Sequence, residues 1–402
     1  MKVHPQELKT ALVLPGGGAR GAFQVGVLKA IAELMPARAI NPFPIISGTS
    51  AGAINTVVLA TKARHFRLAV AELERVWGHF HSGQVFRTDS LTMLKSSLHW
   101  FVAVVLGGYL VGMPKSLLDN SPLRALLSRN IRFPRIQKAI EDGYLHAVAV
   151  TAASYSSSRS TTFFQAAPGN AAWSRTRRIG IQENLHLDHL MASIAVPMIF
   201  PPVAINGEYF GDGAMRQATP LSPAIHLGAD RILVIGIRDE AGVVTTNESA
   251  QHPNFAQIAG YMLDTLFMDG LYSDLERMTR INQLIDAVPP EHRQGPLNTM
   301  RAIDTMMIVP SKDLRVLAFE HREDMPLPLR VLLRGIRGHA GPENRLLSFL
   351  LFERSYTQAL IDLGYSDAMQ LKDQLLDFVG GASVPRLFAP AWVSRDLSQF
   401  SY

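Results

Sequence analysis

The sequence contains no cysteine in its 402 residues. This absence excludes a disulfide scaffold, a cysteine-ligated zinc site and a thiol nucleophile. Charged residues are also few, at 18%, whereas hydrophobic residues make up 47%. A chain of this length and composition buries a large core, and its length predicts two or three domains.

The sequence also lacks a long basic tract, although its formal net charge is +5. Basic residues gather in two places, namely Arg129, Arg132, Arg135 and Lys138, and Arg175, Arg177 and Arg178. Such groups suit an anionic lipid surface or a nucleic acid, but most of them simply solvate the exterior of a protein. Because no nucleic-acid-binding module accompanies them, we expect no nucleic-acid partner.

The first ten residues, MKVHPQELKT, have no apolar stretch of the kind found in a secretory signal, and we therefore expect a cytoplasmic protein. The segment 96–114, SSLHWFVAVVLGGYLVGMP, has no Asp, Glu, Lys or Arg and just reaches the length of a membrane span. Its serines, glycines and short unbroken apolar run argue against a spanning helix. We interpret it as a hydrophobic flap, at about 91–118, or as a docking segment that makes peripheral membrane contact. A spanning helix and an ordinary buried helix are the alternatives.

Strands and helices alternate in the first half of the chain. Predicted strands occupy residues 11–14, 43–47, 146–155, 161–166 and 231–237, and predicted helices occupy 21–34 and 53–63. Asn206-Gly207, between two short runs of alternating apolar residues, predicts a two-residue hairpin. This alternation indicates a mostly parallel α/β sheet.

The second half of the chain is mainly helical. A polar, turn-rich stretch at 245–254 suggests a boundary, and we divide the chain into residues 1–240 and a C-terminal region at 241–402. Helical patterns fill 255–287 and 342–379. One strand-like run, TMMIVP at 305–310, is expected to return to the main sheet.

Ser50 lies in SGTSAGA, where Gly48 and Gly52 complete the pattern G-x-S-x-G between a predicted strand and a predicted helix. A nucleophilic serine needs this position, because the sharp turn lifts its hydroxyl out of the sheet and the small residues two positions away prevent clashes. The N-terminus of the next helix also favours developing negative charge. The alternative is a tight structural turn with an incidental serine.

The glycine-rich stretch after the first strand fits two interpretations. Gly16, Gly18 and Gly21 match G-x-G-x-x-G, the dinucleotide-binding pattern. That pattern requires an acidic residue at the end of the second strand, but none occurs between Glu33 and Glu72. The dinucleotide interpretation therefore fails its own test.

The same stretch suits an oxyanion hole. The backbone N–H groups of Gly17 and Gly18 can stabilise the oxyanion of an acyl-transfer reaction, because glycine permits close approach and unusual dihedral angles. Arg20 either braces this loop, favours an anionic substrate or makes a surface salt bridge.

A nucleophilic serine needs a base, and none of the 13 histidines stands in a motif that marks it as this partner. The pair in HLDH, at 186–189, is a weak metal signal, and we expect a solvated loop there. Asp212 is flanked by Gly211 and Gly213 directly after the predicted hairpin, so a loop can present its carboxylate at close range. A turn aspartate bonded to the local backbone is the alternative.

Together these motifs resemble those of the patatin-like phospholipase family. The resemblance rests on GGGARG at 16–21, GTSAG at 48–52 and GDGA at 211–214, and on the longer block at 192–235. It covers about residues 10–240. The sequence departs from the family pattern in reading Asp-Gly-Ala instead of the commoner Asp-Gly-Gly, and in the hydrophobicity of 96–114.

The resemblance implies a three-layer α/β/α catalytic domain with a helical C-terminal extension. It also implies a lipid acyl hydrolase, of phospholipase A, lysophospholipase or carboxylesterase type, that uses a Ser–Asp dyad on a lipid or ester substrate without a metal or organic cofactor. The roles would be Ser50 as nucleophile, Asp212 as general base, Gly16, Gly17 and Gly18 as the oxyanion hole, and Arg20, Gly21, Gly211 and Gly213 as supporting residues. A non-catalytic lipid-binding or regulatory protein with the same fold is the alternative, and the oligomeric state stays open.

Overall fold

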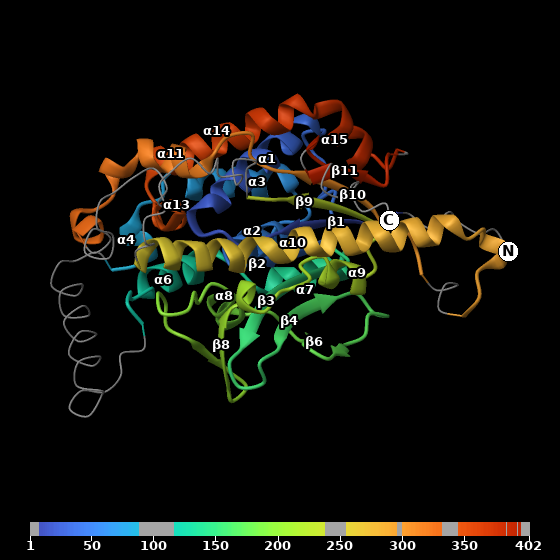
Figure 1. The fold of residues 1–402 in the computed structure, drawn as a ribbon, viewed down its shortest axis with the longest axis horizontal. Helices are drawn as coiled ribbons and strands as arrows, with labels where there is room; N and C mark the ends of the chain where they lie inside the picture. Colours follow the sequence, from blue (N-terminus) through green and yellow to red (C-terminus); the bar gives the residue numbers. More distant parts are fainter. Residues whose placement is uncertain are drawn as a thin grey trace, which may run out of the picture.

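The computed structural model describes residues 8–87, 116–237, 255–295, 300–331, 345–382, 384–391 and 393–394. Its centre is a mostly parallel sheet with helices on both faces (Figure 1). This architecture confirms the α/β/α fold expected from the sequence. The segment 96–114, with most of the expected flap, and the expected boundary near 240 lie outside the described residues.

The sheet has the strand order β11-β10-β9-β1-β2-β3-β4-β6-β5. The strands from β11 to β3 are parallel to one another, β4 runs antiparallel to β3, and the hairpin β7–β8 continues the sheet beside β3. The strand bounds are β1 Thr10–Leu14, β2 Ile45–Thr49, β3 Ala147–Ser154, β4 Ser160–Ala166, β5 Trp173–Arg175, β6 Arg178–Gln182, β7 Val203–Ile205, β8 Glu208–Asp212, β9 Arg231–Ile235, β10 Asp304–Ile308 and β11 Leu387–Phe388.

Helices cover both faces of the sheet. The α-helices are α1 Gly21–Leu34, α2 Ala51–Thr61, α3 Phe66–Trp77, α4 Ser82–Val85, α6 Ser121–Asn130, α7 Pro134–Glu141, α8 Leu187–Ser193, α9 Ser222–His226, α10 Phe255–Ala287, α11 Leu314–Glu320, α13 Arg345–Leu350, α14 Arg354–Gln370 and α15 Lys372–Val379. Short 3-10 helices are η1 Gly18–Arg20, η2 Gly213–Met215, η4 Pro290–His292 and η6 Arg322–Asp324. None of the helices in these ranges is long and apolar enough to cross a bilayer.

The strand β1 shows why the sheet has two buried faces. All five of its residues are buried. Leu12 and Leu14 belong to the large apolar core that contains α1, α2, α3 and α14, whereas Ala11 and Val13 belong to a second core that contains α9 and α10. A continuous apolar run is typical of a parallel strand covered on both sides, because alternate side chains point to opposite faces.

The C-terminal region shares this core. The strand β10 pairs in parallel with β9 inside the main sheet, and α14 packs along α1 (Figure 1). The two helices approach closely at two glycines, because a Cβ atom on Gly26 would lie 2.0 Å from the Ile361 carbonyl oxygen and one on Gly364 would lie 2.2 Å from that of Phe23. Residues from both sides of position 240 thus fill one interior.

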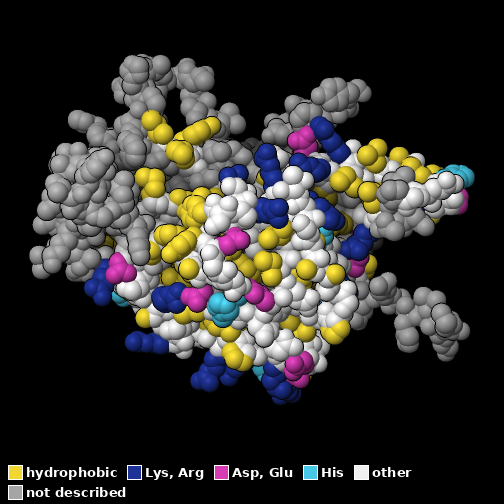
Figure 2. Space-filling view, turned by 90° about the horizontal axis from the view of Figure 1, so that it is seen from below, with side chains coloured by type: hydrophobic (Ala, Val, Ile, Leu, Met, Phe, Trp, Pro, Cys, Tyr) yellow, Lys and Arg dark blue, Asp and Glu magenta, His cyan; other side chains and the backbone are white. Residues whose placement is uncertain are grey.

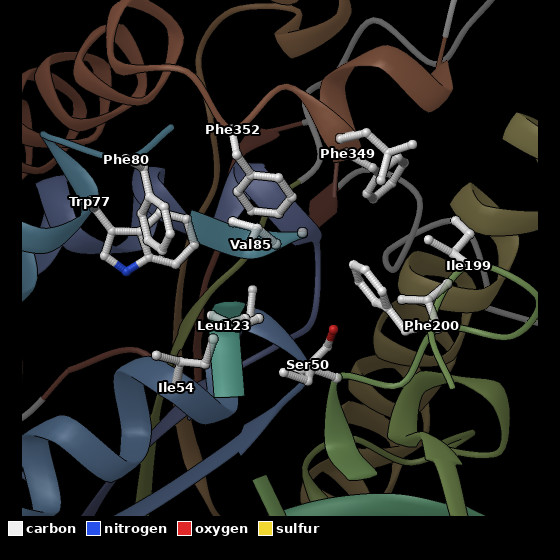
Figure 3. A pocket seen from close by; sticks show the side chains of 15 residues that line it. Ser50, Ile54, Trp77, Phe80, Val85, Leu123, Ile199, Phe200, Phe349 and Phe352 are labelled. Carbon is white, nitrogen blue, oxygen red and sulfur yellow. The ribbon is translucent and has the colours of Figure 1, made fainter. Parts of the chain in front are cut away.

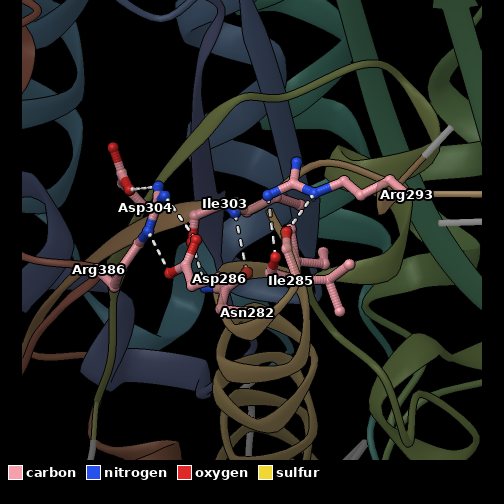
Figure 4. Close-up of polar contacts among 8 residues, drawn as sticks. Asn282, Ile285, Asp286, Arg293, Ile303, Asp304 and Arg386 are labelled. Carbon is pink, nitrogen blue, oxygen red and sulfur yellow. Dashed lines mark hydrogen bonds and ion pairs between the residues drawn. The ribbon is translucent and has the colours of Figure 1, made fainter. Parts of the chain in front are cut away.

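A polar cluster ties the end of α10 to β10 and β11 (Figure 4). Arg386 donates to both carboxylate oxygens of Asp286 at 3.0 Å and to Asp304 at 2.8 Å. Asn282 exchanges two hydrogen bonds with the backbone of Ile303. These contacts fix the register at which the C-terminal strands enter the sheet.

The stretch 342–379, predicted to be mainly helical, forms three helices in its described part, α13, α14 and α15. Residues 351–353 leave the helix between α13 and α14. Leu351 and Phe352 are buried there, and Glu353 accepts hydrogen bonds from the N–H and the hydroxyl of Ser82. Tertiary contacts therefore interrupt a pattern that local sequence would have continued.

Candidate active site

Ser50 occupies the turn between β2 and α2. Its φ angle is 53°, in the left-handed region that side chains other than glycine rarely adopt. The backbone N–H of Ser50 donates to Ser193 Oγ at 2.9 Å, and Ser193 in turn donates to the Thr151 carbonyl at 2.7 Å. A strained serine between strand and helix is the geometry of a nucleophile elbow.

Asp212 is brought to Ser50 by the neighbouring strand β3. The strand β2 pairs with β3 as far as Thr49 opposite Thr151, and β8 takes over with Asp212 opposite Ala152. Because β8 runs antiparallel to β3, its last residue meets the carboxyl end of β2. Two residues distant in the sequence therefore become neighbours through backbone pairing alone.

The two carboxylate oxygens of Asp212 have different surroundings. Oδ1 accepts a hydrogen bond from the Ala214 N–H at 2.9 Å. Oδ2 is buried and has no hydrogen-bond partner of good geometry among the described residues. Burial raises the pKa of Asp212 to about 7, although the nearby Ser50 hydroxyl and the Ala214 N–H both act to lower it. A carboxyl group with this pKa is present in both its protonated and its ionised form near neutral pH.

The glycine loop connects β1 to α1 at the same end of the sheet. Gly18 has a φ of +55° and lines a pocket together with Ser50. A Cβ atom on Gly18 would lie 2.3 Å from the Phe349 carbonyl oxygen, so the position requires glycine on two grounds. Gly17 precedes Gly18, and Gly16 lines a smaller cavity together with Thr49. The glycine loop and the elbow thus contribute residues to the wall of the same pocket.

The remaining predicted glycines hold these loops together. A Cβ atom on Gly52 would lie 2.0 Å from the Leu14 carbonyl oxygen, and one on Gly213 would lie 2.2 Å from the Thr151 carbonyl oxygen. The elbow therefore packs directly against the end of β1, and the aspartate turn packs directly against β3. Three other glycines are also in close contact with their neighbours: Gly21 with Ala51, Gly48 with Thr56 and Gly52, and Gly211 with Tyr155.

Arg20 is buried, with 3% of its surface exposed, so its side chain does not lie on the surface. Its Nε and Nη2 atoms donate to Ser348 Oγ at 3.0 and 2.6 Å, and its guanidinium lies 4.1 Å from the centre of the Phe349 ring. Arg20 therefore links the glycine loop to α13 of the C-terminal region.

An apolar pocket opens at the Ser50 hydroxyl. Figure 3 shows the Ser50 side chain directed into the space enclosed by the pocket walls. The walls include Trp77, Phe80, Val85, Leu123, Ile199, Phe200, Phe349 and Phe352. The cavity volume is about 50 Å³, which is enough for a few small groups. Its apolar lining suits a small apolar group beside the nucleophile.

No histidine lines this pocket in the part of the chain that the structure describes. The expectation of a solvated loop at 186–189 is wrong, because α8 begins there and His189 is fully buried. The ring of His189 lies 2.5 Å from Glu183 Oε1, and burial lowers its pKa to about 4. The apolar residues of α8 draw this segment into the core. Within the described ranges, no group of three or more metal-ligating side chains occurs.

Several supporting residues escape sequence reasoning. Ser193 has no motif of its own, and Phe349 lies far along the chain in a region with no assigned chemistry. A buried chain of hydrogen bonds also braces the glycine loop, from Trp77 to Asn55, from Asn55 to Gln24, and from Gln24 to the Pro15 carbonyl. Polar residues inside apolar helical patterns are the available signal, since buried amides and indoles need partners.

A comparison with models of protein families shows to which family this chain belongs. The family model described as patatin-like phospholipase matches residues 12–225, which is more than half of the chain. The protein belongs to the patatin-like phospholipase family. No curated protein is similar enough to count as a match.

Three solved structures with a similar chain course are each 13% identical to this chain. VipD from Legionella pneumophila aligns over 98% of this chain and 75% of its own, with a TM-score of 0.36. The human GIVD cytosolic phospholipase A2 aligns over 95% of this chain and 60% of its own, with a TM-score of 0.42. The type III effector ExoU aligns over 92% of this patatin-like chain, which spans 54% of ExoU, with a TM-score of 0.30.

Proposed function

We propose that the protein is a lipid acyl hydrolase that cleaves carboxylic ester bonds through Ser50 and Asp212. Family membership supports hydrolysis of lipids. The observation that carries the mechanism is the meeting of a strained Ser50 with the buried Asp212 at the end of β2. The apolar pocket beside Ser50 supports an acyl group as the part of the substrate that is recognised.

The proposed reaction has two stages. In the first, Ser50 Oγ attacks the ester carbonyl carbon and its proton passes to Asp212 Oδ2. The N–H groups of Gly17 and Gly18, with that of Gly16, stabilise the oxyanion, and each such donor typically contributes about 3–4 kcal/mol. The carbon–oxygen bond to the alcohol then breaks, and Asp212 returns the proton to the departing alkoxide.

In the second stage, water hydrolyses the acyl-Ser50 ester. Asp212 takes a proton from the attacking water, and the proton passes to Ser50 Oγ when its bond to the acyl carbon breaks. A carboxylate with its usual pKa near ~4 is a weak base for this task. Burial of Asp212 raises its pKa to about 7 and so strengthens it as a base.

The decisive experiment is hydrolysis of p-nitrophenyl esters of increasing chain length by the wild type, Ser50→Ala and Asp212→Asn. We expect both substitutions to abolish turnover, and a fluorophosphonate probe to label Ser50 in the wild type. A Ser128→Ala variant, on the exposed face of α6, is the matched control and should behave as the wild type. Undiminished turnover by Ser50→Ala would rule out the proposed mechanism.

The same experiment tests the alternative of a non-catalytic lipid-binding protein with this fold. That alternative predicts an inactive wild type that still binds lipid vesicles and resists the fluorophosphonate probe. The intact Ser50 and Asp212, and the strain at Ser50, favour the enzyme.

A further inference from the structure

A second cavity lies on the other face of the sheet from the Ser50 pocket. Its walls come from α9, α10, the β5–β6 hairpin and the residues before β10, and it shares no lining residue with the Ser50 pocket. Its volume is about 420 Å³, much larger than that of the Ser50 pocket. A space of this size holds a small organic molecule.

Four arginines line this cavity, namely Arg175, Arg178, Arg277 and Arg301. Figure 2 shows Lys and Arg side chains gathered near the centre of the face on which β6 and α9 lie. Arg175 and Arg178 belong to a basic group that the sequence suggested would merely solvate the surface, yet the Nε atom of Arg178 is buried and has no hydrogen-bond partner among the described residues.

The positive charges of the cavity are only partly balanced. Asp274 is the one carboxyl group among the described lining residues, and it also accepts the Leu221 N–H at 2.9 Å. Arg277 lies 3.8 Å from Asp274, and Arg301 lies 3.3 Å from Asp230 outside the cavity. Burial lowers the pKa of Arg178, and repulsion by Arg277 and Arg175 adds to this effect, whereas attraction by Asp274 opposes it. An anion in the cavity would relieve this repulsion.

Most of the other lining residues of the cavity are apolar, and the exceptions are Ser222, Asn282 and the imidazole of His226. Met278 and Ile303 are buried in its wall, whereas Ile281 and Met300 are partly exposed at 40% and 47%. His226 stacks on Trp173 with ring centres 4.7 Å apart, and burial with the nearby Arg175 lowers its pKa to about 4. A ligand that fits both parts has an anionic group and an adjoining apolar portion.

We propose that this cavity is a second binding site, for a small molecule that carries a phosphate group next to an apolar portion. Arginine side chains bind phosphate oxygens with paired, charge-assisted hydrogen bonds. The apolar portion lies against Met278 and Met300. The source is either a free phosphate ester or the head group of a phospholipid. The site does not depend on the role of Ser50.

Calorimetric titration of the full chain tests this site. A Ser50→Ala background prevents ester hydrolysis during the titration. The probes are pyrophosphate, dihexanoyl phosphatidic acid and, as a lipid whose head group has no net charge, dihexanoyl phosphatidylcholine. We expect pyrophosphate or phosphatidic acid to bind with a Kd below about 1 mM and Arg178→Gln to weaken binding roughly tenfold or more.

Two further variants separate binding from folding. Arg277→Gln changes a side chain that is 59% exposed and should also weaken binding without loss of stability. Arg129→Gln removes the same charge from the exposed end of α6 and should leave the affinity unchanged. In addition, pyrophosphate should raise the pKa of His226, measured by NMR, because a nearby anion favours the protonated ring.

The outcomes distinguish the two sources. Binding of phosphatidic acid at least tenfold tighter than pyrophosphate, with weak binding of phosphatidylcholine, supports a lipid head group. Equal binding of pyrophosphate and phosphatidic acid favours a free phosphate compound over a phospholipid, and it would overturn the apolar portion of the proposed ligand. Absence of binding by both phosphate probes, or equal affinity in Arg178→Gln, Arg277→Gln and Arg129→Gln, overturns the proposal.

Discussion

At the scale of single residues, the burial of Asp212 leads to a pH dependence of the reaction. The carboxylate is the form that accepts the proton of Ser50, and burial raises its pKa to about 7. We expect kcat/KM for a soluble ester to rise about tenfold per pH unit below pH 7 and to level off above it. A pH–rate profile checks this. A profile that is already flat at pH 5 would show that Asp212 ionises as an ordinary carboxyl group.

The same residue makes the stability of the protein depend on pH. Because the pKa of Asp212 is higher in the folded state than in the unfolded state, the native protein keeps a proton between about pH 4 and 7 that the unfolded chain has lost. Its contribution to the free energy of unfolding therefore falls as the pH rises through this window, by up to about 4 kcal/mol.

Substitution of Asp212 by Asn removes this cost while it abolishes turnover. We expect Asp212→Asn to be more stable than the wild type at pH 8, and the difference to shrink at pH 4.5. Urea unfolding of both proteins at the two pH values measures this. A difference that stays constant with pH would contradict the assignment of the raised pKa to Asp212.

Ser193 offers a test of the elbow itself. Its hydroxyl links the Ser50 N–H to the Thr151 carbonyl, and all three groups are buried. We expect Ser193→Ala to lower kcat with little change in KM, and to reduce the free energy of unfolding by about 1–3 kcal/mol. Steady-state kinetics and chemical denaturation check both effects. A fall in stability with unchanged kcat would limit Ser193 to a structural role.

At the scale of elements, α13 brings the C-terminal region to the proposed site. The ring of Phe349 lines the Ser50 pocket, and its carbonyl lies against Gly18. We expect Phe349→Ala to enlarge the pocket and to shift the preference among p-nitrophenyl esters toward longer or bulkier acyl groups. Phe378→Ala, on α15, is the control: Phe378 is buried outside the pocket, so this variant should lose stability with an unchanged chain-length profile.

Elements whose signal is local follow from the sequence, and those set by distant contacts do not. The buried run of β1, the hairpin turn at Asn206-Gly207 and the bounds of α10 were all predictable, because hydrophobic period and turn residues specify them. The interruption at 351–353 was not, because Glu353 leaves the helix to bind Ser82. The contribution of α13 to the Ser50 pocket could not be predicted either, because it also depends on a contact between distant parts of the chain.

In the candidate site, too, residues within short motifs could be predicted, whereas residues that depend on tertiary contacts could not. The positions of Ser50, Asp212 and the glycine loop follow from short motifs, each with a physical reason for its spacing. Ser193 and the pair formed by Arg20 and Ser348 are hydrogen-bond partners across the fold. Nothing near them in the sequence indicates these pairings, so they could be found only once the chain was folded.

At the scale of the whole molecule, the contact between α1 and α14 joins the two ends of the chain. A Cβ atom on Gly364 would lie 2.2 Å from the Phe23 carbonyl oxygen, and neither backbone can move without disturbing the core. We expect Gly364→Ala to reduce the free energy of unfolding by about 3 kcal/mol or more. Ser366→Ala, on the exposed side of the same helix, should have little effect. Thermal unfolding of both variants measures this difference. Equal stabilities would contradict the close approach of α1 and α14 at Gly364.

The position of β3 has a consequence for heat inactivation. One stretch of this strand pairs with β2 and the next stretch pairs with β8. The positions of both Ser50 and Asp212 therefore depend on a single, fully buried strand. Such central strands exchange their amide protons last and open only when the molecule unfolds globally. Activity and native structure should therefore disappear together on one melting curve, without an earlier, reversible loss of catalysis at lower temperature.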